Sequence, residues 1–425
     1  MISIDAGRRP GGVEVLRPFP PESTSPKIAR PFSLEWLLDP ITPATFVDSY
    51  WEREPLIVNR DDLDYFASLP GLKTIDEIIT ATSSHSSRPT DDVRIVKTDR
   101  HGVLSEHKVQ STPNGVPDIQ RIYREFRRGA SVGINHLHRR SASVALLCSM
   151  LEADLHHPVG ANLYLTPRNG QGLRPHFDTH DVFILQLHGV KEWYVSSPPD
   201  PLPLVSMKQN VAELPSDFCK LTLQPGDALY LPRGFLHYAK TEASLSLHLT
   251  VRIEVYRWID FLNEALRELA EEQAEFRNAL PPGFFDISLN FAHISKLTEY
   301  LARSMSNQDF VERAKLRLGT KLLHASKAAS TSQFASIDVL SDLTIDSVVT
   351  RSPGLFCRVR RTSNEVFIEF CGNFVSGPVF LEPTLNFIAE HEQFIVGELP
   401  GGLSDTDKID LVVYMVGEGL LQLHD

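Results

Sequence analysis

The feature that most constrains the fold is a change in hydrophobic period along the chain. Between about residues 160 and 255, apolar and polar residues alternate in short segments that are separated by Gly, Pro or Asp turns. Such alternation is typical of strands, which we expect at 160–166, 181–187, 191–196, 220–223, 228–232 and 245–255. Six strands in under a hundred residues predict an antiparallel barrel or jelly roll.

Helical patterns lie on both sides of this block of strands. Residues 32–79 hold three segments that begin near a Ser, Thr or Asp that could cap a helix, and we expect this region to be helical. After the strands, an apolar stripe with helical spacing begins at Trp258. Further helices are expected at about 292–305 and 309–328.

The length of the chain predicts more than one domain. Its 425 residues are too many for one ordinary domain. Residues 1–30 are rich in Pro, Gly and Ser and are expected to form a flexible N-terminal tail. The other changes of pattern predict an α+β chain with a barrel domain at 31–255, a helical block at 256–345 and a winged-helix-like module at 346–425.

Charge and composition exclude several classes of function. The formal net charge of −12 argues against a protein that coats nucleic acid. The C-terminal module has 12 Asp and Glu against 5 Lys and Arg, so direct DNA binding is not expected. There is no bilayer-spanning apolar run, no signal-peptide core and no C-x-x-C pair. We therefore expect a cytoplasmic protein that does not contact membranes.

His176 and Asp178 form the only H-x-D sequence in the chain. Residues i and i+2 of a strand point to the same side, so an imidazole and a carboxylate can converge on one metal. A second His from another strand would complete the 2-His-1-carboxylate triad of non-haem iron oxygenases, which leaves three positions open. The motif alone is weak evidence, because about one is expected by chance in a chain so rich in His and Asp. Structural histidines therefore remain the competing interpretation.

Two downstream features favour the metal site. The segment "GDALYLPRGFLHYAKT" (226–241) places His237 on a late barrel strand, where the triad needs its second imidazole. Lys191 lies fifteen residues after His176, at the start of the strand expected at 191–196. A lysine that points into a barrel is costly unless it meets an anion. The sequence thus predicts a metal and an anion in one pocket.

These segments resemble the JmjC-domain 2-oxoglutarate oxygenases, and specifically their ribosomal oxygenase (cupin-4) branch. The resemblance extends over most of the chain and is carried by "YWEREPL" (50–56), "GINHLHR" (133–139), "GANLYLTPRNGQGLRPHFDTHDVFILQLHGVKEW" (160–193), "GDALYLPRGFLHYAKT" (226–241), "SLHLTV" (246–251) and "ELPGGLSDTDKIDLVVYMVGEGLL" (398–421). It implies a double-stranded β-helix (jelly-roll or cupin) JmjC catalytic domain at 31–255. It also implies a helical dimerisation domain at 256–345, followed by the winged-helix-like domain.

The resemblance also assigns roles to individual residues. His176, Asp178 and His237 match the Fe(II) ligands of the family, and Lys191 matches the residue that binds the C5 carboxylate of 2-oxoglutarate. The residues expected to line the cofactor and substrate pocket are Asn162, Tyr164, Thr250 and Ser246. His180 departs from the pattern by extending the motif to H-x-D-x-H, and it is expected to be a second-sphere group or a substrate contact.

The implied function is an Fe(II)- and 2-oxoglutarate-dependent hydroxylase that uses O2 to modify a His or Arg side chain of a ribosomal protein, and that forms a homodimer. A natural-product precursor peptide is an alternative substrate within the same chemistry. Histone demethylation is disfavoured, because the resemblance is to the hydroxylase branch. A metallo-cupin that is not an oxygenase, such as a zinc isomerase, and a non-catalytic scaffold are the competing classes. Structural roles are expected for His136, His138, Trp193, Tyr194 and His248, and His188 is expected to be a solvated loop residue before the turn at Gly189.

Overall fold

The computed structural model describes residues 32–81, 92–99, 101, 103–109, 117–205, 219–326 and 333–423, so the predicted tail at 1–30 lies outside it. Two antiparallel sheets form the centre of the fold: an eight-stranded sheet of order β1-β9-β6-β11-β5-β4-β2-β3 and a three-stranded sheet of order β10-β7-β8. The strands are β1 (Leu56–Val58), β2 (Val93–Thr98), β3 (Leu104–Lys108), β4 (Ser131–Ile134), β5 (Val159–Thr166), β6 (Asp181–His188), β7 (Lys191–Ser196), β8 (Cys219–Leu223), β9 (Ala228–Leu231), β10 (Leu236–Lys240) and β11 (Ser246–Ile253). The predicted α+β class with a cupin-type jelly-roll core is confirmed.

Strands β6, β9 and β11 of the eight-stranded sheet are buried on both faces. On one face, side chains such as Leu163, Phe183 and Leu249 belong to the largest hydrophobic core. Residues from five helices complete this core: α1 (Leu34–Leu38), α2 (Pro43–Ser49), α3 (Ile75–Ala81), α4 (Ile119–Arg127) and α5 (Ala142–Leu155). On the other face, Val182 and Ile184 pack against Trp193 and Val195 of the three-stranded sheet. Burial on both faces explains why the strand at 181–187 is almost continuously apolar.

All six predicted barrel strands are present, with ends within two residues of those expected. The prediction that residues 32–79 are helical throughout is wrong, because Leu56–Val58 forms an edge strand that pairs antiparallel with β9. Strand β3 was also missed, and β10 was expected only as the late strand that carries His237, without bounds. Both are five-residue segments that are stabilised by pairing with a neighbouring strand, and such pairing is weakly signalled by local sequence.

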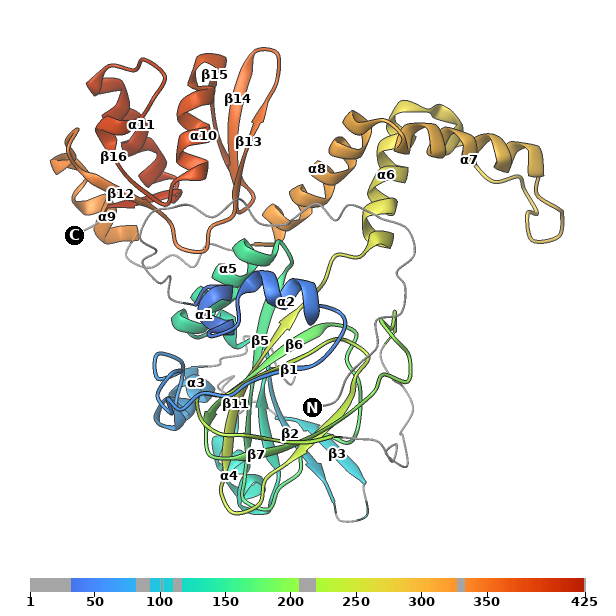
Figure 1. Ribbon diagram of the computed structural model, residues 1–425, viewed down its shortest axis with the longest axis vertical. Helices are drawn as coiled ribbons and strands as arrows, with labels where there is room; N and C mark the ends of the chain where they lie inside the picture. The colour runs from blue at the N-terminus through green and yellow to red at the C-terminus, as the bar shows by residue number, and fades with distance from the viewer. Residues whose placement is uncertain are drawn as a thin grey trace, which may run out of the picture.

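Three helices follow the barrel and extend from it as an arm (Figure 1). They are α6 (Trp258–Glu272), α7 (Phe291–Met305) and α8 (Gln308–Ala325), close to the predicted ranges. Helices α6 and α8 share a small core that includes Leu269 and Phe310. Glu268 of α6 also pairs with Arg313 of α8 at 2.6 Å. Among the residues that the structure describes, no helix is both long and apolar enough to cross a lipid bilayer.

The C-terminal segment folds around a core of its own. It holds two three-stranded sheets, β16-β12-β17 and β13-β14-β15. Its elements are α9 (Gln333–Asp338), β12 (Val348–Arg351), β13 (Cys357–Arg361), β14 (Glu365–Phe370), β15 (Asn373–Pro378), α10 (Glu382–Glu390), β16 (Gln393–Ile395), α11 (Asp405–Gly417) and β17 (Leu421–Leu423). Arg358 joins this segment to α8 by donating to the carbonyl oxygen of Leu316 at 2.7 Å.

The turn between β6 and β7 requires glycine. Gly189 has a φ of +66°, and a Cβ atom there would lie 1.8 Å from the carbonyl oxygen of Leu245. We expect Gly189→Ala to lower the free energy of unfolding by about 2–4 kcal/mol in urea denaturation, because backbone must move to admit the methyl group. Gly71→Ala is the matched control, since its φ is −94° and no atom lies within 4 Å of its Cβ position. Equal losses in the two variants would contradict this account.

Candidate metal centre

A cavity of about 300 Å³ lies inside the barrel. Strands β5, β7 and β11 line it with every second residue, as strand geometry requires for side chains on one face. These residues are Asn162, Tyr164 and Thr166 on β5, Lys191 and Trp193 on β7, and His248 and Thr250 on β11. His176, Asp178 and His237 line the same cavity. The structure therefore brings together every residue of the predicted site except Ser246.

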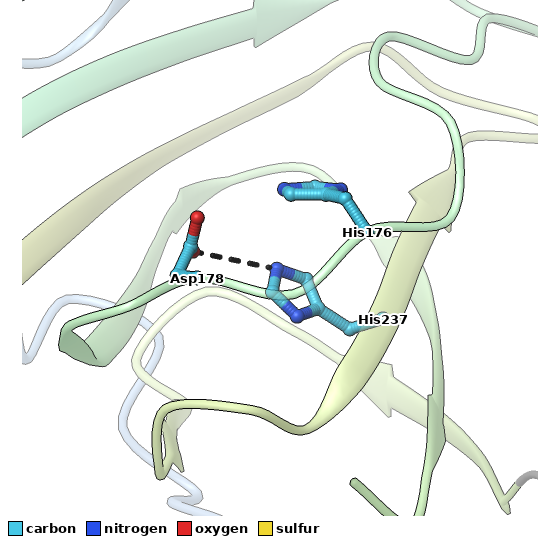
Figure 2. Close-up of side chains that lie close together, drawn as sticks. All are labelled: His176, Asp178 and His237. Atoms are coloured by element: carbon cyan, nitrogen blue, oxygen red, sulfur yellow. Dashed lines mark ion pairs between the residues drawn. The ribbon is translucent and has the colours of Figure 1, made fainter. Parts of the chain in front are cut away.

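The side chains of His176, Asp178 and His237 converge (Figure 2). One ligand atom from each can be chosen so that all three lie within 4.8 Å of one another. Nε2 of His237 lies 3.8 Å from Oδ2 of Asp178. The two histidines are also paired through their backbones, with N–H to carbonyl distances of 3.0 and 2.8 Å. In the part of the chain that the structure describes, no other group of His, Cys, Asp or Glu has this geometry.

Backbone carbonyl groups orient both imidazole rings. Nδ1 of His176 donates to the carbonyl oxygen of Arg174 at 2.7 Å. Nδ1 of His237 donates to the carbonyl oxygen of Phe235 at 3.0 Å. Because a carbonyl oxygen can only accept, the proton of each neutral ring is on Nδ1 and the lone pair of Nε2 is free. This arrangement is common for histidines that bind a metal.

The electrostatics of these residues also suit a cation. Burial lowers the pKa of His237 to about 4, so its imidazole is neutral near pH 7. Burial would raise the pKa of Asp178, but the favourable interactions of its carboxylate with His176, His237, His180 and Arg94 together outweigh that effect, and the pKa falls below its usual value. Two imidazoles and one carboxylate match the donor set of a mononuclear transition-metal site with open positions.

Lys191 is a buried cation in the wall of this cavity. Only 4% of the residue is exposed, and burial lowers its pKa to about 7. Its Nζ donates to Oγ1 of Thr166 at 3.0 Å and lies 3.3 Å from Nδ1 of His248. No carboxylate of the described residues forms an ion pair with it. A buried ammonium group without a counter-charge is costly, so this position suits an anionic ligand.

Tyr164 and Asn162 are held by residues from outside β5. Oη of Tyr164 accepts a hydrogen bond of 2.5 Å from Nη2 of Arg94, on β2. Burial raises the pKa of Tyr164, so the phenol is neutral near pH 7. Oδ1 of Asn162 accepts from the backbone N–H of His136 at 3.0 Å. Arg94 was missed, because nothing in the sequence links it to a strand some 70 residues later.

Two expectations for β11 need correction. His248 was expected to be structural, yet it lines the cavity beside Lys191 and stacks on Tyr164 with a centroid distance of 5.3 Å. A signal was available, since His248 has the same strand parity as Thr250. Ser246 was expected to face the pocket, but it is fully buried, does not line the cavity and accepts from Nε2 of Gln186 at 2.9 Å.

The remaining histidines differ in whether they line the cavity. His180 lines the cavity, and its buried Nδ1 has no hydrogen-bond partner among the described residues. His188 is exposed at the end of β6. Nδ1 of His138 accepts from the backbone N–H of Ala161 at 3.1 Å, as expected of a structural residue. Trp193 was predicted to be packing alone, but it also lines the cavity.

Comparison with known proteins finds a JmjC domain match and relatives among the ribosomal oxygenases. Residues 137–261 match the JmjC domain family. The chain is 33% identical to ribosomal oxygenase 1 of Rattus norvegicus over 276 residues, which cover 62% of this chain and 44% of that protein. It is 30% identical over 309 residues to the bifunctional lysine-specific demethylase and histidyl-hydroxylase NO66 of Drosophila pseudoobscura pseudoobscura, covering 69% and 32% of the two chains. The chain thus spans less than half the length of these relatives.

Solved structures with the same fold include the Escherichia coli ribosomal oxygenase YcfD. One superimposes with a TM-score of 0.55 at 16% identity, and covers 90% of this chain and 98% of that chain. Another, of YcfD in complex with cobalt and 2-oxoglutarate, gives a TM-score of 0.52 at 15% identity and the same coverage. At this identity the likeness establishes the fold.

The triad predicts a divalent metal site, and the affinity of the protein for the metal can be measured directly. We expect the purified protein to bind one Co(II) ion, and we expect His176→Ala to weaken binding at least about 100-fold, because a first-sphere ligand is lost. Calorimetric titration of metal-free protein would measure both affinities. His188→Ala, which changes an exposed histidine of the same segment, is the control and should bind like wild type. Equal affinity in all three proteins would exclude this metal site.

Proposed function

This chain carries a JmjC domain and is a relative of the ribosomal oxygenases, and on that basis we propose that it is an Fe(II)- and 2-oxoglutarate-dependent dioxygenase that hydroxylates a protein or peptide. One observation supports the proposal above all others. The cavity combines a 2-His-1-carboxylate group with a buried lysine that has no protein counter-charge. An oxygenase with a dicarboxylate co-substrate needs the first group to hold the metal and a cation such as this lysine to bind a carboxylate.

In this proposal His176, Asp178 and His237 hold Fe(II) and leave three positions for 2-oxoglutarate and O2. The bound iron supplies the oxidative chemistry that couples decarboxylation of 2-oxoglutarate to hydroxylation. The protein contributes geometry: the carbonyl groups of Arg174 and Phe235 keep each imidazole in the tautomer that offers Nε2. Burial keeps His237 neutral, so a proton does not compete with the metal near pH 7.

Lys191 binds the C5 carboxylate of 2-oxoglutarate in this scheme. Thr166 and the neutral His248 hold its ammonium group in the cavity wall. Asn162, Tyr164 and Thr250 line the space shared by the co-substrate and the target side chain. Arg94 is added to this set, because it fixes the phenol of Tyr164.

The proposed substrate is a His or Arg side chain of a ribosomal protein. Support comes from the relatives, whose names are ribosomal oxygenase 1 and histidyl-hydroxylase NO66. These relatives are longer than this chain, so the substrate is inferred from the part that they share.

We further propose that residues 31–255 are the catalytic domain, 256–345 a dimerisation domain and 346–425 a winged-helix-like domain. The support for a homodimer is a set of exposed aromatic residues on the helical arm. Trp258, Phe285 and Phe291 expose 82%, 90% and 78% of their surface. Trp258 and Phe291 begin α6 and α7, and Phe285 lies between these helices; large exposed apolar side chains along one arm are typical of a protein interface.

Turnover tests the chemistry directly. We expect the Fe(II)-loaded protein to convert 2-oxoglutarate to succinate and to add one oxygen to a ribosomal protein, which mass spectrometry would detect. His176→Ala/Asp178→Ala should lose both activities. Succinate formation that persists in this double variant would refute the proposal, and a zinc-loaded protein without turnover would favour a metallo-cupin of another class.

The pKa of Lys191 predicts how pH affects co-substrate binding. The charged amine binds the carboxylate, and with a pKa of about 7 it must take up a proton on binding above that pH. The Kd for 2-oxoglutarate, measured by titration of the metal-loaded protein, should therefore rise about fiftyfold between pH 7 and pH 9.

Lys191→Met serves as the control for this effect. It should bind 2-oxoglutarate weakly at every pH, and the dependence above pH 7 should vanish. Lys220→Met, which changes an exposed lysine on the neighbouring strand, should keep the wild-type profile. A flat profile in the wild type would contradict the role given to Lys191.

A further inference from the structure

A buried network of charged and polar side chains lies next to the metal-binding segment, outside the cavity. Asp181 is completely buried, and the side chain of Arg233 is only 4% exposed. Nη1 of Arg233 lies 3.2 Å from Oδ1 of Asp181, and Oη of Tyr230 donates to Oδ2 of Asp181 at 2.5 Å. Nη2 of Arg233 pairs with Oε1 of Glu52 at 2.5 Å. None of these four residues lines the cavity.

The network joins the two segments that carry the proposed metal ligands. The backbone N–H of Arg233 donates to Oδ1 of Asp181 at 3.1 Å. Its neighbour Gly234 donates to the carbonyl oxygen of Asp178 at 3.0 Å. Together with the backbone pair between His176 and His237, these contacts connect 176–181 to 233–237 at three successive points. Only the point at Asp181 uses charged side chains.

Glu52 enters this network from the N-terminal part of the chain. It belongs to the "YWEREPL" segment, to which the proposed mechanism gives no task. Its φ of +57° is unusual for a residue with a side chain. The backbone N–H of Glu52 donates to Oη of Tyr230 at 3.0 Å, and Trp51 stacks on the Tyr230 ring with a centroid distance of 6.1 Å. Several contacts thus hold the Glu52 carboxylate against Arg233.

Stability alone does not explain why charges occupy this position. A buried ion pair must recover the cost of removing both charges from water, and apolar residues of similar size often stabilise a fold as well or better. Charged hydrogen bonds do, however, fix the direction and distance of their partners more strictly than apolar contacts do. Here the charged hydrogen bonds between Arg233 and Asp181 fix the position of one segment with proposed metal ligands relative to the other.

We propose that Arg233, held between Asp181 and Glu52, is a positioning residue that sets the spacing between the segment of His176 and Asp178 and the segment of His237. The inference rests on the proposed function, because it assumes that these three side chains bind a metal. It adds that Glu52, which does not line the cavity, controls the geometry of the metal centre through Arg233.

Metal affinity and metal spectroscopy test the proposal without relying on turnover. Co(II) would be titrated into metal-free full-length protein, and the visible absorption of the bound ion would report both its Kd and its coordination geometry. Glu52→Gln removes one ion pair with little risk to folding, since the Glu52 side chain is 35% exposed. Arg233→Lys keeps the charge but loses the paired geometry. Glu54→Gln, at an exposed position two residues away, is the matched control.

We expect the Kd for Co(II) to rise about tenfold in Arg233→Lys and about three- to tenfold in Glu52→Gln, as for other residues that support metal ligands. The absorption spectrum should shift in both, while Glu54→Gln matches wild type. The melting temperature of metal-free Glu52→Gln should stay close to that of wild type.

Other results would overturn the proposal. Wild-type affinity and spectrum in both Glu52→Gln and Arg233→Lys would overturn it and leave the proposed function intact. Weaker binding accompanied by a matching loss of metal-free stability would also overturn it, because the network would then be structural only. If wild type itself binds no Co(II), the proposed function and this inference fail together.

Discussion

The backbone pairing of His176 with His237 is the contact on which the proposed site depends. The two residues come from segments about 60 positions apart, and each donates an N–H to the carbonyl group of the other. His237 lies in β10, but His176 belongs to no regular strand, and the two residues form an isolated bridge. The hydrogen bond from Gly234 to Asp178 and the ion pair of Arg233 with Asp181 hold the same two segments together. The proposed metal centre thus depends on a few contacts between the segment 176–181 and the start of β10, which are supported from outside the cavity.

The same barrel buries a lysine at considerable cost. Lys191 and Trp193 point inward from β7, whereas the apolar residues of β6 and β9 fill the rest of the space between the sheets. A chain under selection for stability alone would place an apolar residue at position 191. An anion that occupies the cavity during function would offset the cost of burying the Lys191 ammonium group, because the ligand supplies the counter-charge.

Sequence reasoning anticipated the barrel and the triad for different reasons. The strands were predictable because their alternation reflects burial on a sheet, and His176 with Asp178 because i and i+2 share a strand face. His237 and Lys191 were candidates from their places on later strands, and the family resemblance then assigned them to Fe(II) and to the C5 carboxylate of 2-oxoglutarate. Arg94 and Glu52 could not be placed in this way, since their importance comes from contacts between distant segments, whereas the strand parity of His248 with Thr250 was a signal that was overlooked. Strand β1 was mistaken for helix because three residues are too few to show a period.

Strand order has a consequence for how the barrel is completed during synthesis. Strand β11 is the last barrel strand in the sequence, yet it lies between β6 and β5 and pairs with both along its length. A ribosome that has made all three proposed metal ligands, up to residue 237, has therefore not yet supplied the strand that lies between β5 and β6. His248 and Thr250 arrive with that strand. The sheet between β5 and β6 can be completed only once residues up to 253 are available, which makes closure of the cavity a late step of folding.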